Sequence, residues 1–278
     1  LVDKDLRYAV YNGKYWLYEV VDGDGGAIQD YKEFPRVRGS SDVSVSNACA
    51  VTTDGVQVFY RDESQGILLG AVKDKNEWRY EIVDGDKDSE ERTTGDVGFH
   101  LKATTVGKKI HLIYDSVRGF DLDRNVTRGD IRYASRGSAF VEDWVYKTLD
   151  VPVEGVAVAG YDVGIFNSKR GINFSWFTAS GISFPNPNQL RYKTLTDTVF
   201  TDVSSANYGK PNSPVSIDEK SILFSCQLRL CSVDKADKKI SLISSGSIQN
   251  EGQSNWITIN KVRYAVAGIS GKLTLLKP

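Results

Sequence analysis

The chain has 278 residues, and its 35 Lys and Arg residues nearly balance its 36 Asp and Glu residues, which gives a formal net charge of −1. No basic stripe stands out, so the charge pattern does not predict nucleic-acid binding. No apolar run approaches the roughly 20 residues that a membrane-spanning helix needs, so we predict no membrane span.

Short runs rich in β-branched and aromatic residues follow one another along the chain, separated by Asn-Gly, Asp-Gly and Gly-Lys pairs. Such runs are typical of β-strands joined by hairpin turns, and no long amphipathic helix pattern interrupts them. We predict that successive repeats begin with strands at Leu6–Tyr11, Ala48–Thr53, Phe99–Val106, Val163–Ser168, Pro214–Asp218 and Trp256–Ile259.

Two phrases recur in these runs. The phrase Trp-x-Tyr-Glu, followed by two apolar residues and Asp-Gly, begins at Trp16 and at Trp78, and Trp144 begins a looser copy. A second phrase, an apolar residue followed by Arg-Tyr, begins at Leu6, Ile131, Leu190 and Val262. Both phrases indicate one supersecondary element used several times.

The repeat length predicts a β-propeller. Six repeats in 278 residues average about 46 residues, close to a four-stranded propeller blade. We predict one domain, a six-bladed propeller over residues 1–278, with approximate repeats 1–44, 45–95, 96–153, 154–210, 211–253 and 254–278. A five-bladed propeller is the alternative, with residues 1–22 as the outer half of the final blade. A β-sandwich also fits spaced short strands.

The tryptophans divide into two groups. Trp16, Trp78 and Trp144 share the first phrase, so one cause, packing between blades, explains all three. Trp176, in NFSWFTASG, lies outside that phrase. Because function can be added where a repeat is broken, we predict that Trp176 contacts a ligand.

Polar residues that follow two predicted second strands are the other candidate binding residues. Arg61 and Asp62 come after the apolar run VFY, and Asp115 comes after LIY. At a blade end these side chains could hydrogen-bond the hydroxyl groups of a ligand. The competing interpretation is a structural salt bridge at the blade rim.

No catalytic motif is present, so the catalytic residues stay unassigned. The two histidines, His100 and His111, have no Cys or carboxylate at metal-ligand spacing and read as ordinary strand residues. The acidic run Asp84 to Glu91 begins like a calcium loop, but Ser89 stands where the sixth-position Gly is expected and Gly95 where the final Glu is expected. We therefore predict no metal and no cofactor, with calcium as the remaining alternative.

Cysteines and sequons predict a secreted protein. Cys226 and Cys231 fall on two short strands that could bring them together as a disulfide, whereas Cys49, in apolar ACAV, reads as a buried thiol. Asn125 and Asn173 stand in Asn-x-Thr and Asn-x-Ser sequons and are predicted glycosylation sites. The chain contains no Met, and a cleaved signal peptide would explain its start at Leu1.

The run VQVFYRDESQGILLGAVKDKNEWRYEIVDG resembles the blades of fungal fucose-binding lectins of the Aleuria type in its pattern of strand, turn, strand and Trp. The resemblance implies a propeller. It does not carry over the fucose site, because Gln57 and Leu69 stand about where that family has its sugar-binding Arg and Glu. The Ser-x-Asp-x-Gly-x-Thr-Trp box of sialidases appears nowhere in the sequence.

The predicted function is that of a secreted, lectin-like propeller that binds glycan or another polar ligand through blade-end loops. The first alternative is a carbohydrate-active enzyme, a glycoside hydrolase or polysaccharide lyase, on the same scaffold. The second alternative is a protein-interaction propeller, because fold does not dictate function. The oligomeric state is left open.

Overall fold

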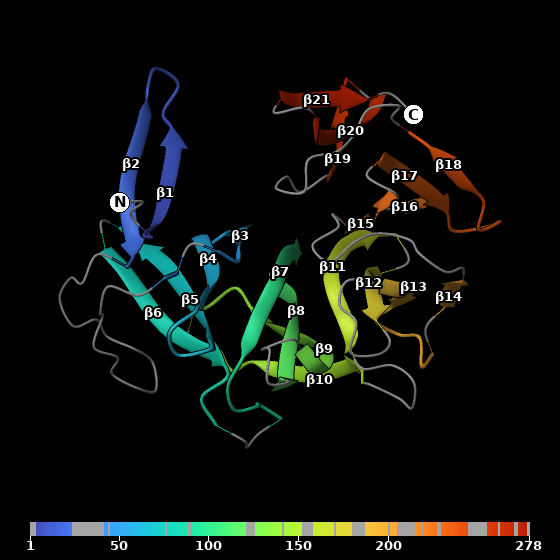
Figure 1. Cartoon of the computed structure of the whole chain (residues 1–278). Coiled ribbons are helices and arrows are strands. Elements are labelled where there is room, and N and C mark those ends of the chain that lie inside the picture. The colour runs from blue at the N-terminus through green and yellow to red at the C-terminus, as the bar shows by residue number, and fades with distance from the viewer. Residues whose placement is uncertain are drawn as a thin grey trace. The chain divides into compact units, whose positions relative to one another are not determined.

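The computed structural model describes residues 4–23, 42–43, 45–75, 77–87, 91–120, 126–140, 142–151, 158–169, 171–179, 187–199, 201–204, 215–217, 219–226, 229–243, 255–260, 262–269 and 272–276. These residues form 21 strands and no helix, which confirms the all-β prediction (Figure 1). All six predicted first strands overlap observed strands, namely β1 (Leu6–Tyr11), β3 (Asn47–Thr52), β7 (Val97–Val106), β11 (Val158–Ser168), β15 (Val215–Ile217) and β19 (Asn255–Ile259).

The chain divides into two compact units, a first unit of Leu1–Ser116 with Tyr133–Lys147 and a second unit of Val117–Arg132 with Thr148–Pro278. Each unit is built mainly from sheets of consecutive antiparallel strands, and one parallel pairing, between Gly129 and Val158, occurs in the second unit. None of these sheets closes on itself, so the blade number and the single-domain arrangement stay predictions.

The first unit begins with a hairpin of β1 (Leu6–Tyr11) and β2 (Trp16–Asp22). A four-stranded sheet follows, with β3 (Asn47–Thr52), β4 (Gly55–Asp62), β5 (Ile67–Asp74) and β6 (Glu77–Asp84) in sequence order. The next strands are neighbours in the order β7 (Val97–Val106), β8 (Lys109–Phe120), β9 (Val126–Gly137) and β10 (Val145–Asp150), and the last three contribute to both units.

The second unit continues the same pattern with three sheets. The first consists of β11 (Val158–Ser168), β12 (Gly171–Ala179), β13 (Pro187–Thr194) and β14 (Thr201–Ser204), and β11 also pairs in parallel with β9. Another contains β15 (Val215–Ile217), β16 (Ser221–Cys226), β17 (Arg229–Asp234) and β18 (Ile240–Leu242). The last contains β19 (Asn255–Ile259), β20 (Val262–Ile269) and β21 (Lys272–Leu276).

Two copies of the recurring Trp phrase, at Trp78 and Trp144, connect their strands to the preceding sheet. The indole of Trp78 donates to Glu19 at 3.2 Å, and the indole of Trp144 donates to Glu81, the residue equivalent to Glu19, at the same distance. Two residues further along, the hydroxyls of Tyr80 and Tyr146 donate to backbone carbonyls of the preceding sheet at 2.5 Å. This repetition confirms that Trp78 and Trp144 have a structural role.

The aspartate that ends the phrase accepts a ring donor from the following strands. Tyr60 donates its hydroxyl to Asp22 and Tyr114 donates to Asp84, each at 2.7 Å, and the indole of Trp176 donates to Asp150 at 2.8 Å. All three aspartates are buried. A buried carboxylate needs such partners, because it has lost its hydration shell.

Three apolar clusters lie between neighbouring sheets. In the first unit one cluster gathers around Tyr60 and Tyr80, and a second gathers around Phe59 and Leu112. In the second unit Phe177 and Leu190 of one sheet pack against residues of β15 to β17, with the rings of Phe177 and Phe224 in edge contact at 6.2 Å. Side chains that alternate along the strands supply both faces of these clusters.

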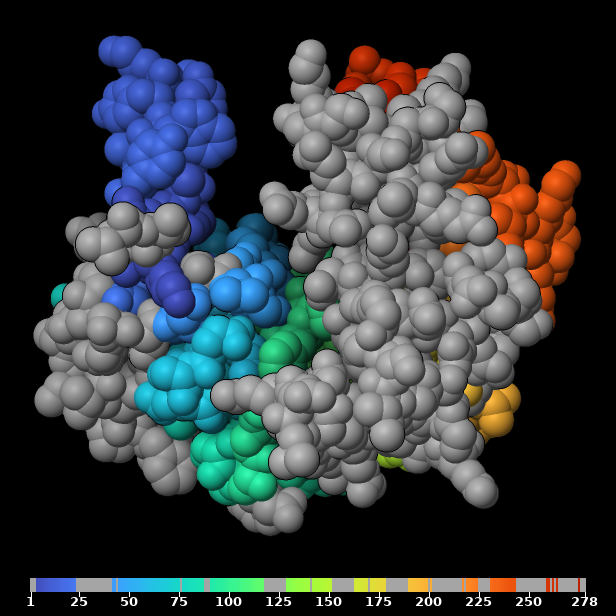
Figure 2. Space-filling view, viewed as in Figure 1, coloured from blue at the N-terminus to red at the C-terminus, as the bar shows by residue number. Residues whose placement is uncertain are grey.

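Trp16 differs from its two equivalents. It is 56% exposed, whereas Trp78 is 8% exposed, and its neighbours Tyr15 and Tyr18 are exposed as well. Figure 2 shows the surface of this β1–β2 hairpin in blue. In the described residues, therefore, Trp16 does not have the packing role that we predicted for it.

Candidate functional site

The start of β7 is the most irregular piece of strand in the first unit. Its pairing with β8 shifts register twice, between Val97 and Phe99 and again between Phe99 and Lys102. Gly98 lies at φ +91° and His100 at φ +48°, a region that residues other than glycine seldom adopt. Such outliers persist only where the surroundings hold them, and they gather at functional sites.

Ser46 holds this bulge from the neighbouring sheet. Its hydroxyl donates to the carbonyl of Gly98 at 2.8 Å and accepts from the backbone N–H of Leu101 at 3.1 Å. The two bonds clamp the backbone on both sides of His100. Because the clamp compensates for the unusual backbone angle, the direction of the His100 side chain is set by the fold.

His100 forms a hydrogen-bonded pair with Asp115 of β8. Nδ1 of His100 lies 2.6 Å from Oδ2 of Asp115. The Asp115 side chain is 4% exposed and that of His100 is 22% exposed, so a buried carboxylate backs a ring that reaches solvent. A carboxylate on Nδ1 favours the tautomer with its proton there and leaves Nε2 as the basic nitrogen.

Arg61 supports the same bulge. Its guanidinium donates to the carbonyl of Val97 at 2.7 Å and to Asp96 at 3.0 Å, and its Nε lies 2.9 Å from Glu63. The guanidinium also lies 3.8 Å from the centre of the Phe99 ring. Arg61 is 3% exposed, so these contacts make it a positioning residue for the bulge and not the direct ligand contact that we predicted.

Asp62 has a local role. It is fully buried, and its Oδ1 accepts from the N–H groups of Ser64 and Gln65 and from the Ser64 hydroxyl. This pattern is that of an Asx turn, which shapes the β4–β5 hairpin. The structure therefore brings Arg61 and Asp115 to one site but assigns Asp62 to a turn.

Trp176 is the clearest correction. It is fully buried and donates to Asp150, a carboxylate that also accepts from Arg191 at 2.9 Å. Trp176 therefore occupies the place that Tyr60 and Tyr114 occupy in other sheets. It does belong to the repeat, through a second-strand position that the Trp-x-Tyr-Glu phrase does not contain, and it cannot stack on a ligand from there.

His111 contrasts with His100. It is 6% exposed, and its Nδ1 lies 2.6 Å from the Tyr133 hydroxyl. Burial, together with the nearby charge of Lys109, lowers the pKa of His111 to about 4. Both histidines were predicted to be ordinary strand residues. That prediction fits His111, but it overlooked the place of His100 in the candidate site. Gly95 and Gly98 just before His100, both at positive φ, were the available signal of an irregular backbone.

The sequons and cysteines have separate outcomes. Asn125 lies outside the described residues. Asn173 is 4% exposed and its amide donates to Ser168, which does not favour glycosylation in the folded chain.

The side chain of Cys226 lies outside the described residues, so its disulfide with Cys231 stays a prediction. Cys49 is exposed, so the prediction that its thiol is buried was wrong. Side chains alternate along β3, and it is the next residue, Ala50, that points into the core.

The acidic run is engaged in protein contacts as far as it is described. Asp84 accepts from Tyr114 and from the N–H groups of Gly85 and Thr93, and Asp86 pairs with Arg92. Among the described residues, no three His, Cys, Asp or Glu side chains form a group that could hold a metal ion. In the same part of the chain, no helix has the length and apolarity to cross a membrane.

Comparison with known proteins places the fold but no family. The sequence matches no protein-family profile and no curated protein. Among solved structures, an α-L-arabinofuranosidase from Lactobacillus brevis is similar with a TM-score of 0.51 and 10% identity, over 83% of this chain and 85% of the other. AofleA from Arthrobotrys oligospora has the same TM-score over 99% of this chain and 80% of the other.

A Trypanosoma rangeli sialidase is similar with a TM-score of 0.56 and 12% identity, over 94% of this chain. The chain spans about half the length of that sialidase, 48%. The arabinofuranosidase and the sialidase are β-propeller enzymes. At these identities the likeness concerns the fold alone, and the chain thus has an all-β fold of the β-propeller kind.

Proposed function

We propose that this protein is a carbohydrate-active enzyme that uses His100 and Asp115 as its acid–base pair. The observation that carries the proposal is a buried carboxylate 2.6 Å from a partly exposed histidine whose backbone is held at positive φ. A structural histidine needs no such backbone angle. Together with the likeness to propeller glycosidases, this favours the enzyme alternative over the lectin-like prediction.

The pair suits chemistry that begins with a proton transfer. Asp115 orients the imidazole and stabilises its protonated form, so Nε2 of His100 can take a proton from a water that attacks the anomeric carbon, while the glycosidic C–O bond breaks and the departing oxygen takes a proton from solvent. Alternatively, the same nitrogen can take a proton from the carbon next to a uronate carboxylate. The C–O bond on the adjacent carbon then breaks, a C=C double bond forms, and the departing oxygen takes a proton from the imidazolium or from solvent. Both reactions cleave the glycan chain and lie within the hydrolase or lyase class.

The residues around the pair could position a sugar and contact it. Phe99 is partly exposed and carries Arg61 on its ring, while Glu63 and Asp96 are held by the Arg61 guanidinium. A rigid aromatic surface beside hydrogen-bonding carboxylates is suited to a sugar ring. The predicted secretion of the protein is part of this proposal, because extracellular glycans would then be accessible.

The experiment is a cleavage assay on a panel of purified neutral and uronate-containing polysaccharides. Reducing ends measure chain cleavage in general, and the absorbance of unsaturated uronates detects elimination. For His100→Asn we expect kcat/KM to fall by about 10²–10⁴-fold. Asn tolerates positive φ, so the melting temperature should stay close to that of the wild type.

The matched control is His111→Gln, which alters the other histidine of the chain. It should retain cleavage activity at pH 7 if it remains folded by circular dichroism. Equal losses in both histidine variants, or no cleavage of any substrate, would reject the proposal. Binding without turnover would restore the lectin-like prediction.

A further inference from the structure

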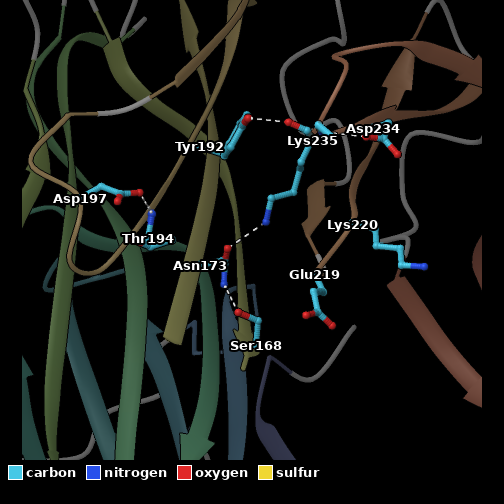
Figure 3. A pocket seen from close by; sticks show the side chains of 10 residues that line it. Ser168, Asn173, Tyr192, Thr194, Asp197, Glu219, Lys220, Asp234 and Lys235 are labelled. Atoms are coloured by element: carbon cyan, nitrogen blue, oxygen red, sulfur yellow. Dashed lines mark hydrogen bonds between the residues drawn. The ribbon is translucent and has the colours of Figure 1, made fainter. Parts of the chain in front are cut away.

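A pocket of about 530 Å³ lies in the second unit, between the β11–β14 sheet and the β15–β18 sheet. Its volume falls in the range of small-molecule sites, about 300–1,000 Å³. Figure 3 shows Asn173, Tyr192 and Asp197 on one side, and Glu219, Asp234 and Lys235 on the other. None of these residues takes part in the His100 site.

Hydrogen bonds between the two sheets hold the floor of the pocket. Lys235 donates from Nζ to Oδ1 of Asn173 at 2.8 Å, and the Tyr192 hydroxyl donates to the carbonyl of Lys235 at 3.0 Å. The Asn173 amide donates in turn to Ser168 at 2.9 Å, as Figure 3 shows. The polar groups are thus placed before any ligand arrives, which lowers the entropic cost of binding.

A similar contact between a side-chain amide and a cation occurs in the first unit, where it is buried. Gln57 accepts from Arg136 at 2.6 Å, and both residues are buried. The Arg136 guanidinium lies 4.7 Å from the Trp144 ring and 5.3 Å from the Phe140 ring. Lys235 remains partly exposed and lines a pocket. The second unit has therefore kept the amide–cation contact and left it accessible.

The chemistry of the lining is mixed and nearly balanced in charge. Asp197, Glu219 and Asp234 face Lys220 and Lys235, so a strongly charged ligand of either sign would meet like charges. Glu219 is exposed and makes no hydrogen bond or ion pair with other residues that the structure describes.

Tyr192 adds a flat ring and a neutral hydroxyl. Burial raises the pKa of Tyr192, and the charges of Asp197 and Asp234 raise it further, so the phenol keeps its proton. Carboxylates that accept, an ammonium that donates, a phenol oxygen that accepts while its proton bonds the Lys235 carbonyl, and one aromatic surface together match a ligand with many hydroxyl groups.

We propose that this pocket binds a neutral saccharide, as a site separate from the His100–Asp115 pair. The inference adds a glycan-binding site to the proposed enzyme but does not require catalysis at His100. A chain held in this pocket would keep the protein attached to its polysaccharide.

The test is a titration with cellobiose, xylobiose, mannobiose and lactose, followed by saturation-transfer NMR and calorimetry. Digalacturonate and a glucosamine dimer serve as charged probes. We expect at least one neutral disaccharide to bind, and Glu219→Gln to weaken it roughly tenfold, as loss of a charged hydrogen bond would. Glu77→Gln, which alters an exposed carboxylate of β6 outside the pocket lining, should leave affinity unchanged.

The outcome separates the two proposals. His100→Asn should keep saccharide binding to the pocket, and Glu219→Gln should keep cleavage of short soluble substrates. Absence of binding by every neutral probe, preference for a charged probe, or equal affinity in wild type and Glu219→Gln would overturn the pocket inference. None of these results would bear on cleavage at His100.

Discussion

The pair Gln57–Arg136 of the first unit and the pair Asn173–Lys235 of the second unit come from corresponding positions of the repeat. Gln57 stands three residues before Tyr60, and Asn173 stands three residues before Trp176, the two rings that donate to the aspartates of preceding strands. In each case the cation comes from the next sheet. The first pair is buried beneath aromatic rings, and the second lines a pocket.

The difference in burial between the two pairs shows that copies of a repeat can keep the same contact and yet differ in how far it is exposed to solvent. Arg136 also pairs with buried Glu81 at 2.7 Å, so the first pair belongs to a buried charge network. Lys235 donates to the neutral amide of Asn173, and both residues line a pocket. The His100 bulge is a second such departure, placed on β7 while the ring–aspartate contact of Tyr114 is retained.

The largest expected effect tests the repeat contact itself. Trp176→Ala should lower the free energy of unfolding by about 4–5 kcal/mol, the upper part of the range for a buried Trp. It opens a cavity and removes a donor from Asp150. Urea unfolding of Trp176→Ala and of Trp16→Ala, a 56% exposed control, measures this. A folded, unchanged Trp176→Ala would return Trp176 to the surface role predicted from sequence.

The next effect contrasts the two cations. Arg136→Met should cost about 3–4 kcal/mol, because it leaves the Glu81 carboxylate buried without its cation. Lys235→Met should cost about 1 kcal/mol or less, because the ammonium is partly exposed and bonds a neutral amide. Chemical unfolding of both variants at one pH provides the comparison. Similar costs would mean that the two pairs are equally sealed.

A smaller effect tests whether the ring–aspartate contacts are equivalent. Tyr60→Phe and Tyr114→Phe should each cost about 2 kcal/mol, since each removes a hydroxyl that donates to a buried carboxylate. Thermal unfolding should show the two losses agreeing to within about 0.5 kcal/mol. Tyr11→Phe is the control, because Tyr11 donates to Gly13 at an exposed turn. Unequal losses would show that the two contacts share a geometry but do not contribute equally to stability.

The last prediction is a pH dependence that separates the two histidines. The pKa of His111 is about 4 in the folded chain against an ordinary value of 6.5, so the unfolded chain binds the proton more readily. Its contribution to stability is present above pH 6.5 and is lost as pH falls toward 4.

His111→Gln should therefore show a shallower loss of stability over that pH interval, by less than one proton. Urea midpoints measured across the interval give this slope directly, with His100→Asn as the comparison variant. An identical slope in His111→Gln and wild type would mean that His111 does not stay neutral in the fold.

Much of the fold followed from local pattern. Strand alternation and turn residues depend on neighbours in sequence, so the first strands were located without tertiary information. The Trp-x-Tyr-Glu phrase indicated contacts between sheets, and Trp78 and Trp144 make them. The place of Trp176 was predicted wrongly because Tyr and Trp exchange at one ring-donor position, and a search for identical phrases does not detect that exchange.

The candidate site was harder to predict than the scaffold. Arg61 and Asp115 were chosen for following second strands, and the structure does gather them at the β7 bulge. His100 was passed over because its partner is 15 residues away and on another strand. The pocket of the second unit depends on residues from separate sheets, which no spacing along the chain reveals.

By itself, then, the sequence determined the all-β class, the strands and the recurrence of one building element, because these depend on side-chain alternation and turn chemistry over a few residues. Tertiary structure alone decided which polar groups are buried and which reach solvent. The register shifts of β7 rotate His100 onto Asp115, and the packing of rings over Arg136 but not over Lys235 separates a sealed charge from an accessible one. Burial is a property of the neighbours that folding brings together, and identical local patterns can therefore have different roles.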